Sequence, residues 1–133
     1  MELDTKKVMV LLQRKWNSIR EIDRLTKELE EAFARNDEVS VAMLLQLRAD
    51  EMGAVERCME DLWQLGEISR EDYEALRELI TSDPQERTGK TPEEKKIYEI
   101  RRKTQCLLDK LRESDQQLNQ KMTGNKSYYR REQ

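Results

Sequence analysis

The sequence predicts an all-α protein, namely an elongated antiparallel helical bundle of three long helices and one short helix. Good helix formers dominate the 133 residues, which include only four Gly and two Pro for the turns that a sheet would need. Only 36% of the residues are apolar and 40% are charged, so one domain of this size cannot build a thick core. A thin core between long helices fits this composition.

Two long helices are expected near 4–35 and 38–65, because apolar side chains recur there every three or four residues. Asn36-Asp37 separates the two helices and supplies an N-cap, and Gly66 is expected to end the second helix as its C′ residue. The first stripe contains Val8, Leu12, Ile19, Ile22, Leu29 and Phe33; the second contains Val41, Leu44, Leu45, Met52, Val55, Met59, Leu62 and Trp63.

A short helix is expected over 70–80. Ser69 and Asp72 have the spacing of a capping box, and Ile68 and Tyr73 have the spacing of a hydrophobic staple. The polar segment 81–91 holds both a Pro and a Gly, which predicts an exposed, mobile loop.

The last helix is expected near 92–123, with Thr91 as N-cap, Pro92 at the first helical position and Gly124 as its end. Residues 1–123 then form a single helical-bundle domain, and residues 124–133 form a basic tail that we expect to be flexible. Tyr128 and Tyr129 give that tail two aromatic side chains, for which the sequence indicates no definite role.

The composition argues against an enzyme and against a bound metal or cofactor. The chain has no His, the commonest general base and metal ligand, and its two cysteines, Cys58 and Cys106, are far apart in sequence. The apolar run near the N-terminus, Val8 to Leu12, is too short for a signal peptide or a membrane span. We therefore expect a cytoplasmic protein with reduced thiols and no membrane-spanning segment.

Four local patterns allow a functional interpretation beside a structural one. Gly89-Lys90-Thr91 resembles the end of a phosphate-binding loop, but Pro84 replaces the first glycine of that motif, so helix capping is the favoured interpretation. The tail Lys126–Arg131 and the cluster Arg101-Arg102-Lys103 could contact nucleic acid, but the chain is acidic overall, with a formal charge of -3, and we expect no nucleic-acid partner.

The methionines and Arg48 supply the other two patterns. Met43, Met52, Met59 and Met122 recur along helical segments and either fill gaps in the core or form an adaptable binding surface. Arg48 lies on the apolar stripe of the second helix, where it is expected to extend an exposed head past apolar neighbours. Together with Arg20-Glu-Ile-Asp23 it gives the chain a faint resemblance to the helical chorismate mutases, an enzymatic alternative for which no catalytic residue is assigned.

The chain as a whole resembles bacterial flagellar export chaperones of the FlgN/FliT kind. The resemblance lies in the long opening helix, the break at Arg35-Asn-Asp37 and two helical segments. These segments are Leu44-Leu-Gln-Leu-Arg48 with Glu51-Met52, and Leu107-Leu-Asp-Lys-Leu111 followed by Asp115-Gln-Gln-Leu-Asn119. The resemblance implies a cytoplasmic chaperone of the flagellar type III export system that binds helical C-terminal segments of hook-filament junction proteins.

In that family the last helix commonly binds the substrate, which here implies a partner site at Leu107, Leu108, Leu111, Leu118 and Met122. Lysines and arginines crowd the leading half of this helix, so we expect it to dock loosely and to exchange its contacts for those of a partner helix. The structural alternative is a self-associating scaffold or adaptor, such as a homodimer, that covers its apolar stripes with a second copy.

Overall fold

The computed structural model describes the backbone of residues 3–132 and the side chains of residues 3–122. It contains four helices and, within the described residues, no strand. The helices are α1 (Thr5–Ala34), α2 (Glu38–Gln64), α3 (Arg70–Thr81) and α4 (Pro92–Glu132). The all-α prediction is confirmed.

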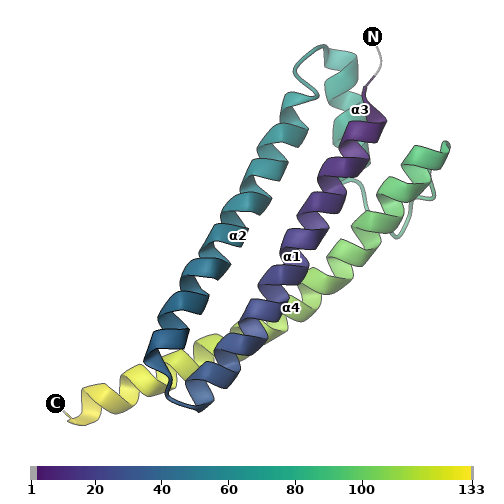
Figure 1. Cartoon of the computed structure of the whole chain (residues 1–133). Coiled ribbons are helices and arrows are strands. Elements are labelled where there is room, and N and C mark those ends of the chain that lie inside the picture. Colours follow the sequence, from purple (N-terminus) through teal and green to yellow (C-terminus); the bar gives the residue numbers. More distant parts are fainter. Residues whose placement is uncertain (1–2, 133) are drawn as a thin grey trace.

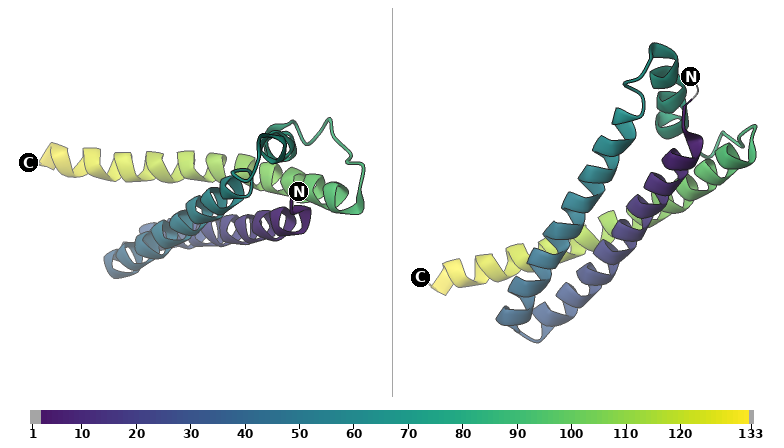
Figure 2. Two further views of the ribbon diagram at one scale, coloured as in Figure 1. Left: turned by 90° about the horizontal axis from the view of Figure 1, so that it is seen from above. Right: turned by 45° about the horizontal axis from the view of Figure 1, so that its top comes forward.

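The helix α1 runs alongside α2, and α4 crosses these two helices obliquely (Figure 1 and Figure 2). Three apolar clusters lie along α1. The first joins Val8 and Leu11 to Leu62 of α2, Leu76 of α3 and Ile97 of α4; the second joins Ile19 and Ile22 to Val55 and Leu111; the third joins Leu25 and Leu29 to Leu44 and Leu118. From cluster to cluster the residue numbers fall along α2 and rise along α4. Thus α2 runs antiparallel to α1, and α4 runs in the same direction as α1.

The long helices do not pack equally against one another. Backbone contacts are extensive between α1 and α2 and between α1 and α4, whereas α2 and α4 make at most marginal backbone contact. The accessible surface is 9320 Å², compared with roughly 7,400 Å² expected for a compact monomer of 15.9 kDa. The arrangement is therefore an open one, in which α1 is covered from two sides.

Local side chains determine where the helices begin. The carboxylates of Asp4 and Asp37 accept hydrogen bonds from the amides of Lys7 and Ser40, and the Ser69 hydroxyl accepts one from the Asp72 amide. Asn36 precedes the second of these caps with a φ of 57°, a left-handed conformation that asparagine tolerates better than most residues. The predicted break at Asn36-Asp37 is confirmed.

Two details of the turn between α2 and α3 differ from the expectations. Ile68 and Tyr73 are both exposed and form no staple, since Tyr73 instead lies 5.8 Å from Trp63 between ring centroids. Gly66 does follow the end of α2, but within the described residues Gly89 is the glycine with a positive φ. A Cβ on Gly66 would lie 3.1 Å from both Leu76 and Tyr73, so close packing of α3 is what favours glycine at this position.

The expected helix end at Gly124 is wrong, because α4 continues through it to Glu132. One glycine costs a helix about 1 kcal/mol relative to alanine, which does not by itself end a long helix. The C-terminal end of α4 projects past the turn between α1 and α2 (Figure 2). The side chains of the tail 124–133, including Tyr128 and Tyr129, lie outside the described residues, and the flexibility of this tail remains a prediction.

Candidate partner-binding surface

The structure places the five sequence-predicted site residues on the face of α4 that meets α1. Leu111 and Leu118 are buried, in separate apolar clusters with Ile19 and with Leu25. Leu107 and Leu108 are half-buried against the cluster of Leu111, and Met122 is half-buried against that of Leu118. The intact chain therefore gives a partner only partial access to this set.

The leading half of α4 is not the loosely docked segment that the sequence suggested. Ile97, Tyr98 and Ile100 are all buried in the largest apolar cluster, against Val8 and Leu62. Their lysine and arginine neighbours point away from this cluster or bind other groups of the chain, and so leave the apolar face free to pack. The expectation of weak docking is wrong because three apolar residues at helical spacing are enough to anchor this half.

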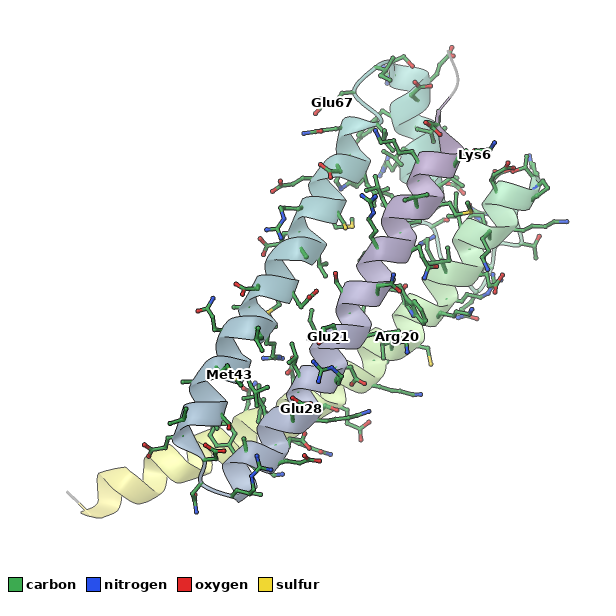
Figure 3. The ribbon with its side chains drawn as sticks, in the orientation of Figure 1. Lys6, Arg20, Glu21, Glu28, Met43 and Glu67 are labelled. Carbon is green, nitrogen blue, oxygen red and sulfur yellow. The ribbon has the colours of Figure 1, made fainter. Side chains whose placement is uncertain are left out.

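The helix with the most uncovered apolar surface is α2. Of its 27 residues only Leu44 and Leu62 are buried. Met43 is 58% exposed and Met52 is 39% exposed, and Val39, Leu45 and Leu47 are also exposed. Figure 3 labels Met43 on the lower half of α2. Met43 and Met52 are thus the two of these methionines whose side chains are exposed, while Met59 and Met122 pack against the core.

The exposed and half-buried apolar side chains of α2 form two stripes. Val39, Met43 and Leu47 follow one another at four-residue spacing and make up the outer stripe. Leu45, Met52 and Met59 follow one another at seven-residue spacing, which keeps them on one face, and make up the groove stripe. Met59 lines a cavity together with Leu108 of α4. The groove stripe therefore faces the gap between α2 and α4, and Leu108 borders the same gap.

An ion pair joins α2 to α4 across this gap. The Arg48 guanidinium pairs with the Asp115 carboxylate and donates a second hydrogen bond, of 3.0 Å, to the Thr26 hydroxyl of α1. Thr26 is buried, and its hydroxyl donates in turn to the Ile22 carbonyl. The Arg48 side chain is only 14% exposed, so the expectation of an exposed head is wrong. Because its charge is already paired, Arg48 does not supply the free cation that the enzymatic alternative required.

The basic cluster Arg101-Arg102-Lys103 contacts other parts of the chain. Arg101 donates to the carbonyls of Leu79 and Ser82, and Arg102 donates to those of Pro84 and Arg87. These bonds fix the segment 82–91 against α4, and Pro84 is buried there. Lys103 pairs with Glu99 at 3.4 Å. Most of this segment is exposed, as the sequence predicts, although two guanidinium groups on consecutive positions bind four backbone carbonyls of the segment and of the residues beside it; its mobility stays a prediction.

Gly89-Lys90-Thr91 forms the start of α4. The Thr91 hydroxyl accepts a hydrogen bond from the Glu94 amide, and the Glu94 carboxylate accepts one from the Thr91 amide, which completes a capping box. Gly89 has a φ of 83°, and a Cβ there would lie 2.6 Å from the Lys95 nitrogen. The capping interpretation of this motif is confirmed, and chain geometry accounts for its glycine.

Neither cysteine forms a disulfide, and in the described part of the chain no three acidic or cysteine side chains gather where a metal ion could be held. Cys58 is half-buried, and burial raises the pKa of its thiol; Cys106 is exposed. None of the helices, over the residues described, combines the length and apolar character needed to cross a membrane.

No family model, curated protein or solved structure matches this chain.

The sequence patterns identified Met52 and Met59 as candidate binding residues, but they did not separate the groove stripe from the core-facing residues of α2. Its residues had been assigned to the same apolar stripe as Leu44 and Leu62. The available signal was the width of that stripe, since residues at both 44–45 and 62–63 are apolar and one neighbouring helix cannot cover such a broad face.

Proposed function

We propose that the protein binds an amphipathic helix of a partner protein in the gap between α2 and α4, as a chaperone or adaptor. The observation that carries this proposal is the exposure of Leu45 and Met52 in the groove stripe, on a helix that buries only two of its own residues. Exposed apolar side chains on one helix, with a second helix beside them, suit a partner helix with apolar side chains at three- and four-residue spacing. The methionines favour the proposal, because flexible thioethers adapt to varied side chains.

The sequence resemblance gives this proposal a biological setting. On that basis the protein is a cytoplasmic chaperone of the flagellar type III export system, and the bound helix is a C-terminal segment of a hook-filament junction protein. The bound helix would lie beside both α2 and α4. The free and the bound protein would then differ mainly in the exposure of the apolar side chains of α2.

The five predicted residues of α4 have unequal roles in this proposal. Leu108 borders the groove beside Met59 and meets the partner directly. Leu107 lies on the other side of α4, near Arg20 and Asp23 of α1. Leu111, Leu118 and Met122 become available only where the end of α4 moves away from α1, which the partner helix must then compensate with contacts of its own.

The structural alternative, a self-associating scaffold, uses the same groove. A second copy of this chain could place its own α2 there, because an isologous dimer pairs a surface with itself. The exposed stripes of α2 favour either occupant over an enzymatic role, for which the described residues supply no assigned catalytic group.

Two methionines on opposite sides of α2 allow a matched test. We expect Met52→Glu, in the groove stripe, to weaken binding of a hook-filament junction protein's C-terminal peptide by at least about tenfold, since a carboxylate must be desolvated there. Met43→Glu, in the outer stripe, makes the same chemical change at a more exposed position and should leave binding within about twofold. Fluorescence anisotropy of a labelled peptide measures both.

Leucine variants provide the same comparison on α4. Leu108→Gln should weaken peptide binding, whereas Leu107→Gln, on the other side of the helix, should not. Equal losses in both methionine variants would contradict the groove placement. A dimer seen by light scattering that Met52→Glu dissociates, together with no binding of any exported flagellar segment, would favour the scaffold instead.

A further inference from the structure

A cavity of about 260 Å³ lies where the four helices meet, beside Met59 of the groove stripe. Its wall includes apolar residues from α1, α2 and α3, together with Pro84 of the connecting segment. Three cationic side chains also line it, Lys15 from α1 and Arg101 and Arg112 from α4, against one carboxylate, that of Asp109. The lining therefore carries a positive charge within an otherwise acidic protein.

Lys15 is the least compensated of these cations. It is half-buried, and no described carboxylate lies within salt-bridge distance of its ammonium group. Burial lowers the pKa of Lys15, and the neighbouring Arg101 guanidinium lowers it further. A charged group held in this position without a counter-ion destabilises the folded chain.

Arg101 lines the cavity and has N–H donors that no hydrogen bond within the described part of the chain uses. Its guanidinium has five N–H donors, and it makes three hydrogen bonds, to the Leu79 carbonyl, the Ser82 carbonyl and the Ser82 hydroxyl. All of these acceptors are uncharged. No described carboxylate lies within salt-bridge distance of the Arg101 guanidinium. Burial lowers the pKa of Arg101, and the more distant Asp83 and Tyr98 offset this only in part.

The third cation and the single carboxylate lie at the exposed rim. Arg112 and Asp109 form a pair at 3.6 Å, and both side chains are more than half exposed. Their charges largely offset each other, which leaves Lys15 and Arg101 as the uncompensated pair deeper in the wall. Arg112 can still turn a second donor toward a group that enters the cavity.

We propose that this cavity binds an oxyanion, a phosphate or carboxylate group, between Lys15 and Arg101. The volume is smaller than that of a typical ligand pocket, about 300–1,000 Å³, so the bound group has few atoms or is the anionic end of a longer molecule. A guanidinium and an ammonium together suit such a group, because both donate charge-assisted hydrogen bonds. Anion binding needs no partner helix, since this chain alone forms the cavity.

The test compares the thermal unfolding of the full chain in sodium phosphate, in sodium malonate and in sodium chloride at equal ionic strength. We expect one or both oxyanions to raise the unfolding temperature of the wild type above its value in chloride, because a ligand that binds only the folded state stabilises it. Lys15→Met should unfold at a higher temperature than the wild type in chloride, since an uncompensated charge is removed. It should bind the anion more weakly, on the order of tenfold.

Lys110→Met is the matched control, because Lys110 is an exposed lysine of α4 that does not line the cavity. It should respond to the anions as the wild type does. Met52→Glu should also keep the anion response while losing the partner peptide, which separates this site from the proposed function. A response to phosphate but not malonate, or the reverse, identifies the class of oxyanion.

Nuclear magnetic resonance keeps the test decisive if a variant fails to fold. In the wild type, titration with the same salts should shift the amide signals of Thr104 and Gln105, which line the cavity, and not that of Ser40 at the far end of the molecule. An unchanged response in Lys15→Met, or no response of the wild type to either oxyanion, would overturn the proposal.

Discussion

At the scale of single residues, two glycines of this chain have opposite requirements. Gly89 has a positive φ, and its missing Cβ leaves room for the backbone of Glu94 and Lys95. Gly53 lies within α2, where the only close neighbour of an added Cβ is the Arg57 guanidinium at 3.2 Å. A flexible arginine head can move aside, whereas the first turn of α4 cannot.

Alanine at these two positions should therefore shift stability in opposite directions. Gly89→Ala should lower the free energy of unfolding by at least about 1–2 kcal/mol, the cost of a left-handed conformation for a residue with a Cβ. Gly53→Ala should raise it by about 0.5–1 kcal/mol, the difference in helix propensity. Urea titration followed by circular dichroism measures both. A stabilised Gly89→Ala variant would contradict the left-handed conformation and the close backbone approach at the start of α4.

The lowered pKa of Lys15 predicts a dependence of stability on pH. Its ordinary pKa of 10.5 applies to the unfolded chain and a lower value to the folded one, so between the two the unfolded chain binds more protons. Stability therefore rises with pH in this window. The advantage of Lys15→Met over the wild type should be largest near neutral pH and should shrink as the pH approaches 10.5.

The titration of the Cys58 thiol must be excluded from this comparison. Burial raises the pKa of its thiol above 9.0, so its titration lowers stability with rising pH in an overlapping range. Both proteins should therefore carry Cys58→Ala, and the difference in urea unfolding between them should be followed from pH 7 upward. A difference that does not change with pH would show that Lys15 is not desolvated.

At the scale of the helices, α1 and α2 have similar lengths but differ strongly in how many of their side chains are buried. Nine residues of α1 are buried, compared with two of α2. A helix with few buried side chains opens more readily, because few apolar contacts are lost when its backbone hydrogen bonds break. The face of α2 that we propose as a binding surface is thus on the least protected long helix.

Hydrogen exchange should show this difference between helices. We expect amides in the middle of α2, near Met52, to exchange faster than those near Ile22 in the middle of α1, and to slow when the partner peptide binds. The leading half of α4, near Ile100, serves as the internal reference, since it is buried in the largest cluster. Equal protection of α1 and α2 in the free protein would argue against an uncovered α2.

The sequence predicted the helix starts well, because a cap depends on residues that are neighbours in the chain. Asp37, Ser69 and Thr91 each accept the hydrogen bond that their position implies. The burial of the α2 side chains depends instead on where α4 lies, and no local sequence pattern indicates that position. The same holds for Arg48, whose charge is paired by Asp115 on a distant part of the sequence, and for Arg101 and Arg102, whose acceptors are carbonyls that every sequence provides.

At the scale of the whole molecule, the accessible surface is large because α2 and α4 both pack on α1 and not on each other. Each of the other long helices packs mainly on α1, so the apolar surface that α2 and α4 would bury against each other in a closed bundle stays in contact with solvent or with whatever enters the groove. Arg48 and Asp115 are then the polar link that limits how far the two helices can separate.

The course of α4 also determines how far apart the molecule holds groups that are attached to its two ends. The N-terminal end of α1 and the C-terminal end of α4 lie at opposite ends of the long axis (Figure 1). With 41 residues, α4 alone extends over about 60 Å. Groups joined near Leu3 and near Glu132 are thus held apart as by a spacer, and a cargo attached at one end does not crowd a docking partner at the other.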